Sequence, residues 1–175
     1  MRKITEPESF TSPTLEARGL KFRRLVVQDV SRTLALERLC YKNAWTADNF
    51  IGELDSTIGF NFGIFYDHTL LAMAITWLID PESHLLNLAV HPQVRRQGLG
   101  RELLTTTAQC AKSLGATVMH LEVAVGNRAA QTLYKNMGFK TVGFRNNYYQ
   151  EGGDAILMNL NLNNLLRSTP KPGTL

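Results

Sequence analysis

The sequence lacks any apolar run long enough to cross a bilayer. A membrane-spanning helix needs roughly 20 apolar residues, whereas the apolar stretch at 73–79 has only the length of a strand. The N-terminus also lacks the apolar middle region of a secretory signal, and Glu6, Glu8 and Glu16 count against a transit peptide. We therefore expect a cytoplasmic protein with no membrane partner.

Cysteine is scarce as well, since Cys40 and Cys110 are the two cysteines of the chain. They have no paired C-x-x-C spacing, and no local motif supports either of them as a nucleophile. Isolated cysteines of this kind are usually buried apolar residues in a reducing compartment. The sequence thus predicts neither a disulfide framework nor a metal site.

Long runs of one charge are also missing. The net charge of +4 is mildly basic, but no Lys/Arg-rich stretch carries interleaved aromatic residues. Direct nucleic-acid binding is therefore not expected. With 44% hydrophobic and 19% charged residues, the 175-residue chain has the composition and length of one ordinary globular domain.

Between residues 21 and 166 the hydrophobic periodicity alternates between that of strands and that of helices. Strands are expected at 22–27, 60–66, 70–79, 84–90, 117–125, 139–149 and 155–162. Helices are expected at 29–40 with Asp29 as the cap, after Thr46, at 99–114 and at 127–137. This order predicts one α/β domain in which helices cover a mixed sheet.

The two ends of the chain differ from this domain. Residues 1–20 and 167–175 contain scattered proline, glycine and polar residues without periodicity. We expect a flexible N-terminal extension and a flexible C-terminal tail.

A glycine-rich loop, 95–100 (Arg-Arg-Gln-Gly-Leu-Gly), stands between a predicted strand and a predicted helix. Such a loop presents backbone N–H groups to an anion at the positive end of the helix. A nucleoside-triphosphate loop would need G-x-x-x-x-G-K-[S/T], and a dinucleotide loop would need a third small residue where Leu103 stands. Both of these sites are excluded, and another phosphate ligand remains.

Two motifs together resemble those of the GNAT superfamily, the GCN5-related N-acetyltransferases. Arg95-x-x-Gly98-x-Gly100 is similar to the pyrophosphate-binding pattern of that family. Residues 121–139 resemble the L-E-V-x-x-x-N-x-x-A-x-x-L-Y-x-x-x-G-F signature of RimI-type enzymes, which acetylate the N-terminal alanine of a small-subunit ribosomal protein. The resemblance covers roughly residues 22–162 and implies a GNAT fold, with a mixed, mostly antiparallel sheet flanked by helices.

The resemblance also implies a binding site for acetyl-CoA, the expected co-substrate. Backbone N–H groups of residues 96–101 would hold the pyrophosphate, and residues 88–90 would run beside the pantetheine arm. The Val90 N–H would then donate to the thioester oxygen. The complete set of expected contacts is Leu88, Ala89, Val90, Arg95, Arg96, Gln97, Gly98, Leu99, Gly100, Arg101 and Asn127.

By the same resemblance, Glu122 is the expected general base and Tyr134 the expected general acid. The chemistry is reasonable, because an amine must be neutral to attack a thioester. At pH 7 an α-amine with a pKa of about 7.8 is roughly 15% neutral, whereas a lysine amine near about 10.4 is only about 0.04% neutral. A carboxylate can therefore suffice as the base for an N-terminal acceptor. His91 and His120 are further candidate bases: the family pattern assigns no role to His91, and His120 lies two residues before Glu122 on the same strand face.

The acceptor is less well defined than the donor. A protein N-terminus, with the N-terminal alanine of a ribosomal protein as the first candidate, is expected from the resemblance. A polyamine, a lysine or another small amine is the alternative, as is a non-catalytic sensor of acyl-CoA. Ala124 stands where many relatives carry arginine, on the acceptor side of the expected site.

Overall fold

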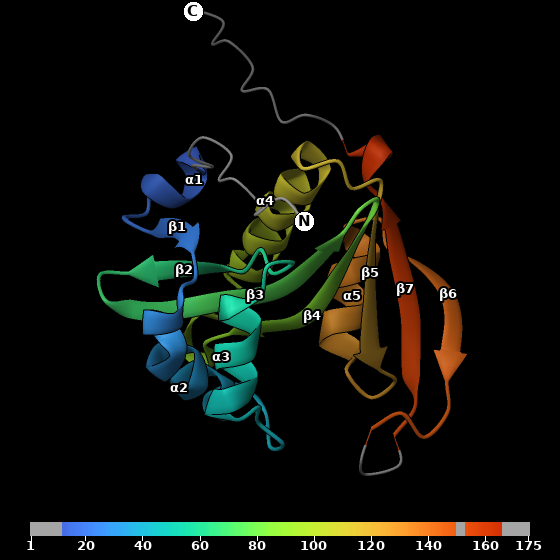
Figure 1. The fold of residues 1–175 in the computed structure, drawn as a ribbon, viewed down its shortest axis with the longest axis horizontal. Helices are drawn as coiled ribbons and strands as arrows, with labels where there is room; N and C mark the ends of the chain where they lie inside the picture. The colour runs from blue at the N-terminus through green and yellow to red at the C-terminus, as the bar shows by residue number, and fades with distance from the viewer. Residues whose placement is uncertain (1–11, 150–152, 166–175) are drawn as a thin grey trace, which may run out of the picture.

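A seven-stranded sheet with helices on both faces organises the described part of the chain, residues 12–149 and 153–165 of the computed structural model (Figure 1). The strand order is β1-β2-β3-β4-β5-β7-β6. Neighbouring strands pair antiparallel except β4 and β5, which pair in parallel. The strands are β1 (Lys21–Arg24), β2 (Phe62–Tyr66), β3 (Thr69–Ile79), β4 (Glu82–Val90), β5 (Val118–Ala124), β6 (Lys140–Arg145) and β7 (Ala155–Asn161). The mixed, mostly antiparallel sheet that the sequence predicts is confirmed.

The helices divide between the two faces of this sheet. They are α1 (Pro13–Glu16), α2 (Val30–Cys40), α3 (Ala47–Asp55), α4 (Leu99–Ser113) and α5 (Arg128–Asn136). On one face, Leu103 of α4 and Tyr134 of α5 share a core cluster with Met119 of β5. On the other face, Leu36 of α2 and Phe50 of α3 form a second cluster. Figure 1 shows α1 and α4 on one side of strands β2 to β4, and α2 and α3 on the opposite side.

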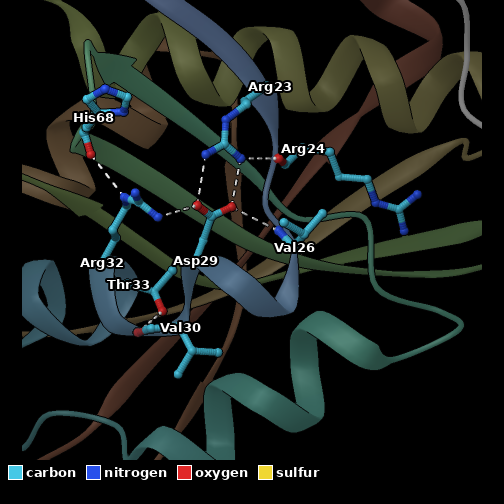
Figure 2. A network of polar contacts seen from close by, with 8 residues as sticks. All are labelled: Arg23, Arg24, Val26, Asp29, Val30, Arg32, Thr33 and His68. Carbon is cyan, nitrogen blue, oxygen red and sulfur yellow. Dashed lines mark hydrogen bonds and ion pairs between the residues drawn. The ribbon is translucent and has the colours of Figure 1, made fainter.

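Asp29 connects β1 to the beginning of α2 (Figure 2). Its side chain is 2% exposed, and both carboxylate oxygens accept from the Arg23 guanidinium, at 2.7 and 2.8 Å. Arg32 lies 3.3 Å away, and the Val26 N–H donates at 3.2 Å. These contacts, the bond from Arg23 first, hold the pKa of Asp29 below its usual value. Asp29 does stand at the N-cap position, but its side chain makes no capping bond to α2, because the two arginines occupy it.

The expected flexible extension differs from what the structure describes at residues 12–20. The Ser12 hydroxyl accepts from the Leu15 N–H and donates to the Glu102 carboxylate of α4. Leu15 is fully buried, and Leu15 and Leu20 belong to the same core cluster as α4. The domain therefore includes these residues, because Leu15 in α1 and Leu20 after it anchor them to the core. Residues 1–11 and 166–175 lie outside the described residues.

None of the helices in residues 12–149 and 153–165 has both the length and the apolar character that a membrane span requires.

Candidate active site

The strands β4 and β5 separate halfway along their length. Residues Glu82–Leu85 of β4 pair in parallel with residues Val118–Leu121 of β5. Beyond this point β4 follows β3 as far as Val90, and β5 follows β7 as far as Ala124. Figure 1 shows the two strands diverging below their common end. The second half of each strand therefore has one edge that faces the gap.

Backbone groups of β4 point into this gap. The His91 N–H donates to the Leu71 carbonyl of β3 at 2.8 Å. Successive residues of a strand point their N–H and C=O groups to opposite sides. Leu88 and Val90 therefore direct theirs toward the gap, whereas Ala89 directs its groups toward β3. Of the three residues expected along the pantetheine arm, Leu88 and Val90 thus present backbone groups to the gap, and Ala89 lines the cavity there.

Side chains already engage the carbonyls on this edge. The Tyr41 hydroxyl donates to the Leu88 carbonyl at 2.7 Å. The Val90 carbonyl accepts from Nε of Arg95 at 3.0 Å and from the Cys40 thiol at 3.3 Å. The end of α2 and the loop after β4 are thus attached to the edge that the gap exposes.

The glycine loop, residues 95–100, lies at the end of the gap, where α4 begins. Gly98 has a φ of +85°, a left-handed conformation that glycine adopts without strain. A Cβ at Gly100 would lie 3.3 Å from Cγ2 of Val90 and 3.6 Å from Leu133, so the absence of a side chain allows β4 and α5 to approach. The loop borders a cavity of about 550 Å³ between β4, α4 and α5, here called the loop cavity.

The loop cavity has the chemistry of a phosphate site. The N-terminus of the 15-residue helix α4 opens onto it, so unpaired N–H groups and the helix dipole favour an anion. Arg95, Arg96 and Arg101 all line it. These features fit the pyrophosphate of coenzyme A.

Several expected contacts have other roles as well. Nη2 of Arg101 donates to the Asn136 carbonyl at 3.0 Å and ties α4 to α5. The Leu99 side chain is buried in the core, so its backbone alone can face a ligand. Within the described residues, Gln97 is not part of the cavity wall, and its carbonyl accepts from Arg18 at 3.4 Å.

A second cavity, of about 640 Å³, continues from the loop cavity through the gap and is here called the central cavity. Tyr41, Leu88, Asn127 and Tyr134 line both cavities, so they mark the junction between them. Asn127 caps α5, because its Oδ1 accepts from the Ala130 N–H at 3.1 Å. The cap position predicted from the sequence is thus observed, and it brings Asn127 to the junction.

Tyr134 reaches the junction from α5. Its side chain is 6% exposed and its ring lies 5.6 Å from that of Phe139. Burial raises the pKa of Tyr134 well above that of a free phenol. The hydroxyl therefore stays protonated at neutral pH and can act as a proton donor.

Glu122 lines the central cavity from the opposite face of the sheet. Its neighbours Leu121 and Val123 are buried in the α4 cluster, so the alternation of β5 turns Glu122 toward the side of α2 and α3. Its side chain is 27% exposed, and Oε1 lies 2.7 Å from Nη1 of Arg145. A hydrogen bond to Glu122 also raises the pKa of Tyr148. The structure thus brings the expected base and the expected acid to one cavity, from different faces of the sheet.

A third hollow, of about 720 Å³, extends from Glu122 along the outer halves of β4 and β5 and is here called the outer cavity. The His84 and His120 rings stack in it at 5.2 Å, and Glu82 lies 3.5 and 3.7 Å from them. Burial and the neighbouring His120 lower the pKa of His84. His120 is therefore on the same face as Glu122, whereas His91 caps the short turn Pro92–Val94 and lines none of the three cavities.

Sequence reasoning did not identify Glu37, Tyr41 and Asn87, which also line the central cavity. Glu37 is buried, and desolvation raises its pKa although bonds from Asn87 and the Trp45 N–H oppose the shift. Glu37 and Tyr41 lie on or beside a helix with an ordinary polar pattern. No motif marked them, because their importance comes from the tertiary position of α2 over the gap.

Metal ligands do not gather at this site: residues 12–149 and 153–165 contain no group of three or more His, Cys, Asp or Glu that could hold a metal ion.

Comparison with known proteins gives a consistent result. Residues 30–139 match the family described as Acetyltransferase (GNAT) family. The chain is 33% identical over 139 residues to the [ribosomal protein bS18]-alanine N-acetyltransferase of Salmonella typhimurium, covering 78% of this chain and 93% of the relative. It is 41% identical over 78 residues to an N-alpha-acetyltransferase of Sulfurisphaera tokodaii, covering 44% of this chain and 47% of that one.

Among solved structures, the ribosomal-protein-S18-alanine N-acetyltransferase from Escherichia coli superposes with a TM-score of 0.77 at 32% sequence identity. The match covers 82% of this chain and 94% of that one.

Proposed function

Because this chain belongs to the GNAT family of acetyltransferases, we propose that it acetylates the N-terminal α-amine of a protein, with the N-terminal alanine of a ribosomal protein as the first candidate. The observation that carries the proposal is the continuity of the loop cavity with the central cavity, which Glu122 and Tyr134 both line. The names of the Salmonella typhimurium and Escherichia coli relatives support the acceptor.

Acetyl-CoA supplies the acetyl group as a thioester. The backbone N–H groups at the start of α4 bind its pyrophosphate, and Arg95, Arg96 and Arg101 add positive charge around the loop cavity. The backbone of Leu88 and Val90 orients the pantetheine arm in the gap, as a neighbouring strand would. The Val90 N–H is directed toward the thioester oxygen, where a preorganised donor stabilises developing negative charge.

Glu122 accepts the proton that the acceptor ammonium must lose before it attacks. The carboxylate is accessible from the central cavity, and the outer cavity leaves room for the residues that follow the acceptor N-terminus. Arg145 orients the carboxylate through the 2.7 Å contact. A carboxylate is a strong enough base for an α-amine, because a much larger fraction of an α-amine than of a lysine amine is already neutral at pH 7.

Tyr134 donates a proton to the departing sulfur. It stands at the junction of the two cavities, where the thioester would meet the amine. Its phenol is fully protonated because burial raises its pKa. Direct attack of the amine on the thioester needs no enzyme nucleophile, and burial raises the pKa of the Cys110 thiol to about 12.

Release of free coenzyme A from acetyl-CoA tests the proposal over three acceptors. The panel contains an Ala-starting peptide, its N-terminally blocked version with an internal lysine, and spermidine. We expect turnover on the unblocked peptide alone. Turnover on the blocked peptide or on spermidine instead would overturn the acceptor assignment, and silence on all three would favour a non-catalytic sensor of acyl-CoA.

A further inference from the structure

A buried carboxylate in the wall of the central cavity has no cationic partner among the described residues. Glu37 is 1% exposed. Its Oε2 accepts from Nδ2 of Asn87 at 2.9 Å and its Oε1 from the Trp45 N–H at 3.3 Å, and both donors are neutral. Buried carboxylates are normally paired with a positive charge, because desolvation of the anion is costly. Among the described residues, the Glu37 carboxylate thus has two neutral donors and no ion pair.

Asn87 supplies a second unused acceptor at the same place. Its side chain is 8% exposed, and within the described residues its Oδ1 has no hydrogen-bond partner. Buried amide oxygens nearly always accept a hydrogen bond, so this atom also lacks a donor. Glu37 and Asn87 both line the central cavity, as Glu122 does.

A β-bulge in β4 accounts for the position of Asn87. The register with β3 passes from Ile75 opposite Asn87 to Thr76 opposite Leu85, which leaves Leu86 as the extra residue. Leu86 packs in the cluster of α2 and α3 and Asn87 bonds to α2, so these consecutive side chains share one face. Bulges often redirect side chains next to functional sites. Without the bulge, Asn87 and Glu37 would lie on opposite faces of the sheet.

We propose that Glu37 and Asn87 form the subsite that binds the α-ammonium group of the acceptor and positions it in the central cavity. An ammonium group carries three N–H donors and one positive charge, which match one carboxylate and one free amide oxygen. Glu37 holds the cation, and Glu122 on β5 remains the group that accepts its proton. This assignment rests on the proposed function and makes it more specific, because it identifies the residues that recognise the charged terminus.

A pair of peptides tests this subsite directly. One begins with alanine, and the other is its des-amino analogue, in which a propionyl group replaces the alanyl residue. Their dissociation constants are measured by calorimetry with coenzyme A present. Wild-type protein should bind the amine peptide about 10- to 100-fold more tightly than the des-amino analogue, because the analogue lacks the hydrogen bonds to the charged carboxylate. In Glu37→Gln this ratio should fall close to one, while the affinity for acetyl-CoA is retained.

The ratio separates recognition from a merely structural role, which would weaken both peptides equally and would overturn the proposal. Asp48→Asn serves as the matched control, because Asp48 is an exposed carboxylate on α3 that lines none of the three cavities. It should keep the wild-type ratio. If Glu37→Gln does not fold, the wild-type measurement still decides, because equal binding of both peptides overturns the subsite without any variant.

The result is also separable from the proposed function. Acetylation of the Ala-starting peptide together with equal binding of the two peptides would leave the proposed function standing and overturn this subsite. Acetylation of spermidine alone would overturn the proposed function and the subsite with it.

Discussion

Nη1 of Arg145 lies 2.7 Å from Oε1 of Glu122. Arg145 ends β6, Glu122 belongs to β5, and β7 lies between these two strands in the sheet. The arginine therefore reaches across a whole strand to hold the carboxylate. Both side chains are partly exposed, so solvent screens the pair and it adds little to stability. Its value lies in fixing the direction of the carboxylate toward the central cavity.

Glu122→Gln is expected to lower kcat/KM for an Ala-starting peptide by about 100-fold or more, since it removes the proton acceptor and keeps the shape. Acetyl-CoA affinity should change little. Steady-state kinetics across pH measures the loss. Glu16→Gln is the control, because Glu16 is an exposed carboxylate on α1 that lines none of the three cavities. A rate unchanged at every pH in Glu122→Gln would remove Glu122 from the mechanism.

Tyr134→Phe should lower kcat by about 10- to 100-fold, because the departing sulfur loses its proton donor. The ring remains packed against Phe139, so KM for acetyl-CoA should change by no more than about threefold. Since burial raises the pKa of Tyr134, the wild-type rate should also show no loss from ionisation of this phenol up to about pH 10. Tyr66→Phe, at an exposed position on β2, is the control. Equal turnover in Tyr134→Phe and wild type would contradict the role.

Gly98→Ala isolates the conformation of the glycine loop. A Cβ at Gly98 would meet nothing within 4 Å, but φ is +85°, so the expected cost is about 1 kcal/mol from backbone strain alone. Gly52→Ala in α3 is the matched control, because a Cβ at Gly52 would also meet nothing within 4 Å. Alanine favours a helix interior over glycine, so this substitution should raise the free energy of unfolding by about 0.5–1 kcal/mol. Urea unfolding measures both. Gly98→Ala should in addition raise KM for acetyl-CoA, whereas Gly52→Ala should not. A Gly98→Ala protein that is no less stable than wild type would show that the strain at Gly98 is negligible.

Much of the site could be predicted from the sequence because it depends on local structure. The glycine loop, the Asn127 cap and the strand that carries Glu122 each arise within a few neighbouring residues. Glu37 and Asn87 could not be predicted in this way. Their pairing requires α2 to pack over the gap and β4 to contain a bulge, and neither leaves a periodic pattern in the sequence.

The ends of elements show the same limit. Leu15 stands in a stretch without periodicity, so its burial depends on a contact with α4, which lies far away in the sequence. Asp29 has the residue type and the position of a helix cap, but its partners are arginines on β1 and α2. Local sequence preference thus predicted the position of Asp29, but its hydrogen bonds depend on the arginines that the tertiary structure brings next to it.

The Asp29 carboxylate should make stability depend on acid pH. Its contacts with Arg23 and Arg32 lower its pKa in the folded state below the unfolded value of about 3.9. A depressed folded pKa means that the unfolded chain binds the proton more readily, so the contribution is complete above the unfolded pKa. It is then lost as the pH falls through the folded pKa.

Asp29→Asn should therefore cost about 2 kcal/mol at pH 7, because it leaves a network with two arginines and no anion. The difference from wild type should shrink below about pH 4, where the wild-type carboxylate also becomes neutral. Urea unfolding between pH 3 and pH 8 measures both curves. Asp67→Asn is the control, because Asp67 is exposed in the β2–β3 turn and should follow wild type within about 0.5 kcal/mol. Parallel curves for Asp29→Asn and wild type would mean that the ion pairs with Arg23 and Arg32 do not couple stability to pH.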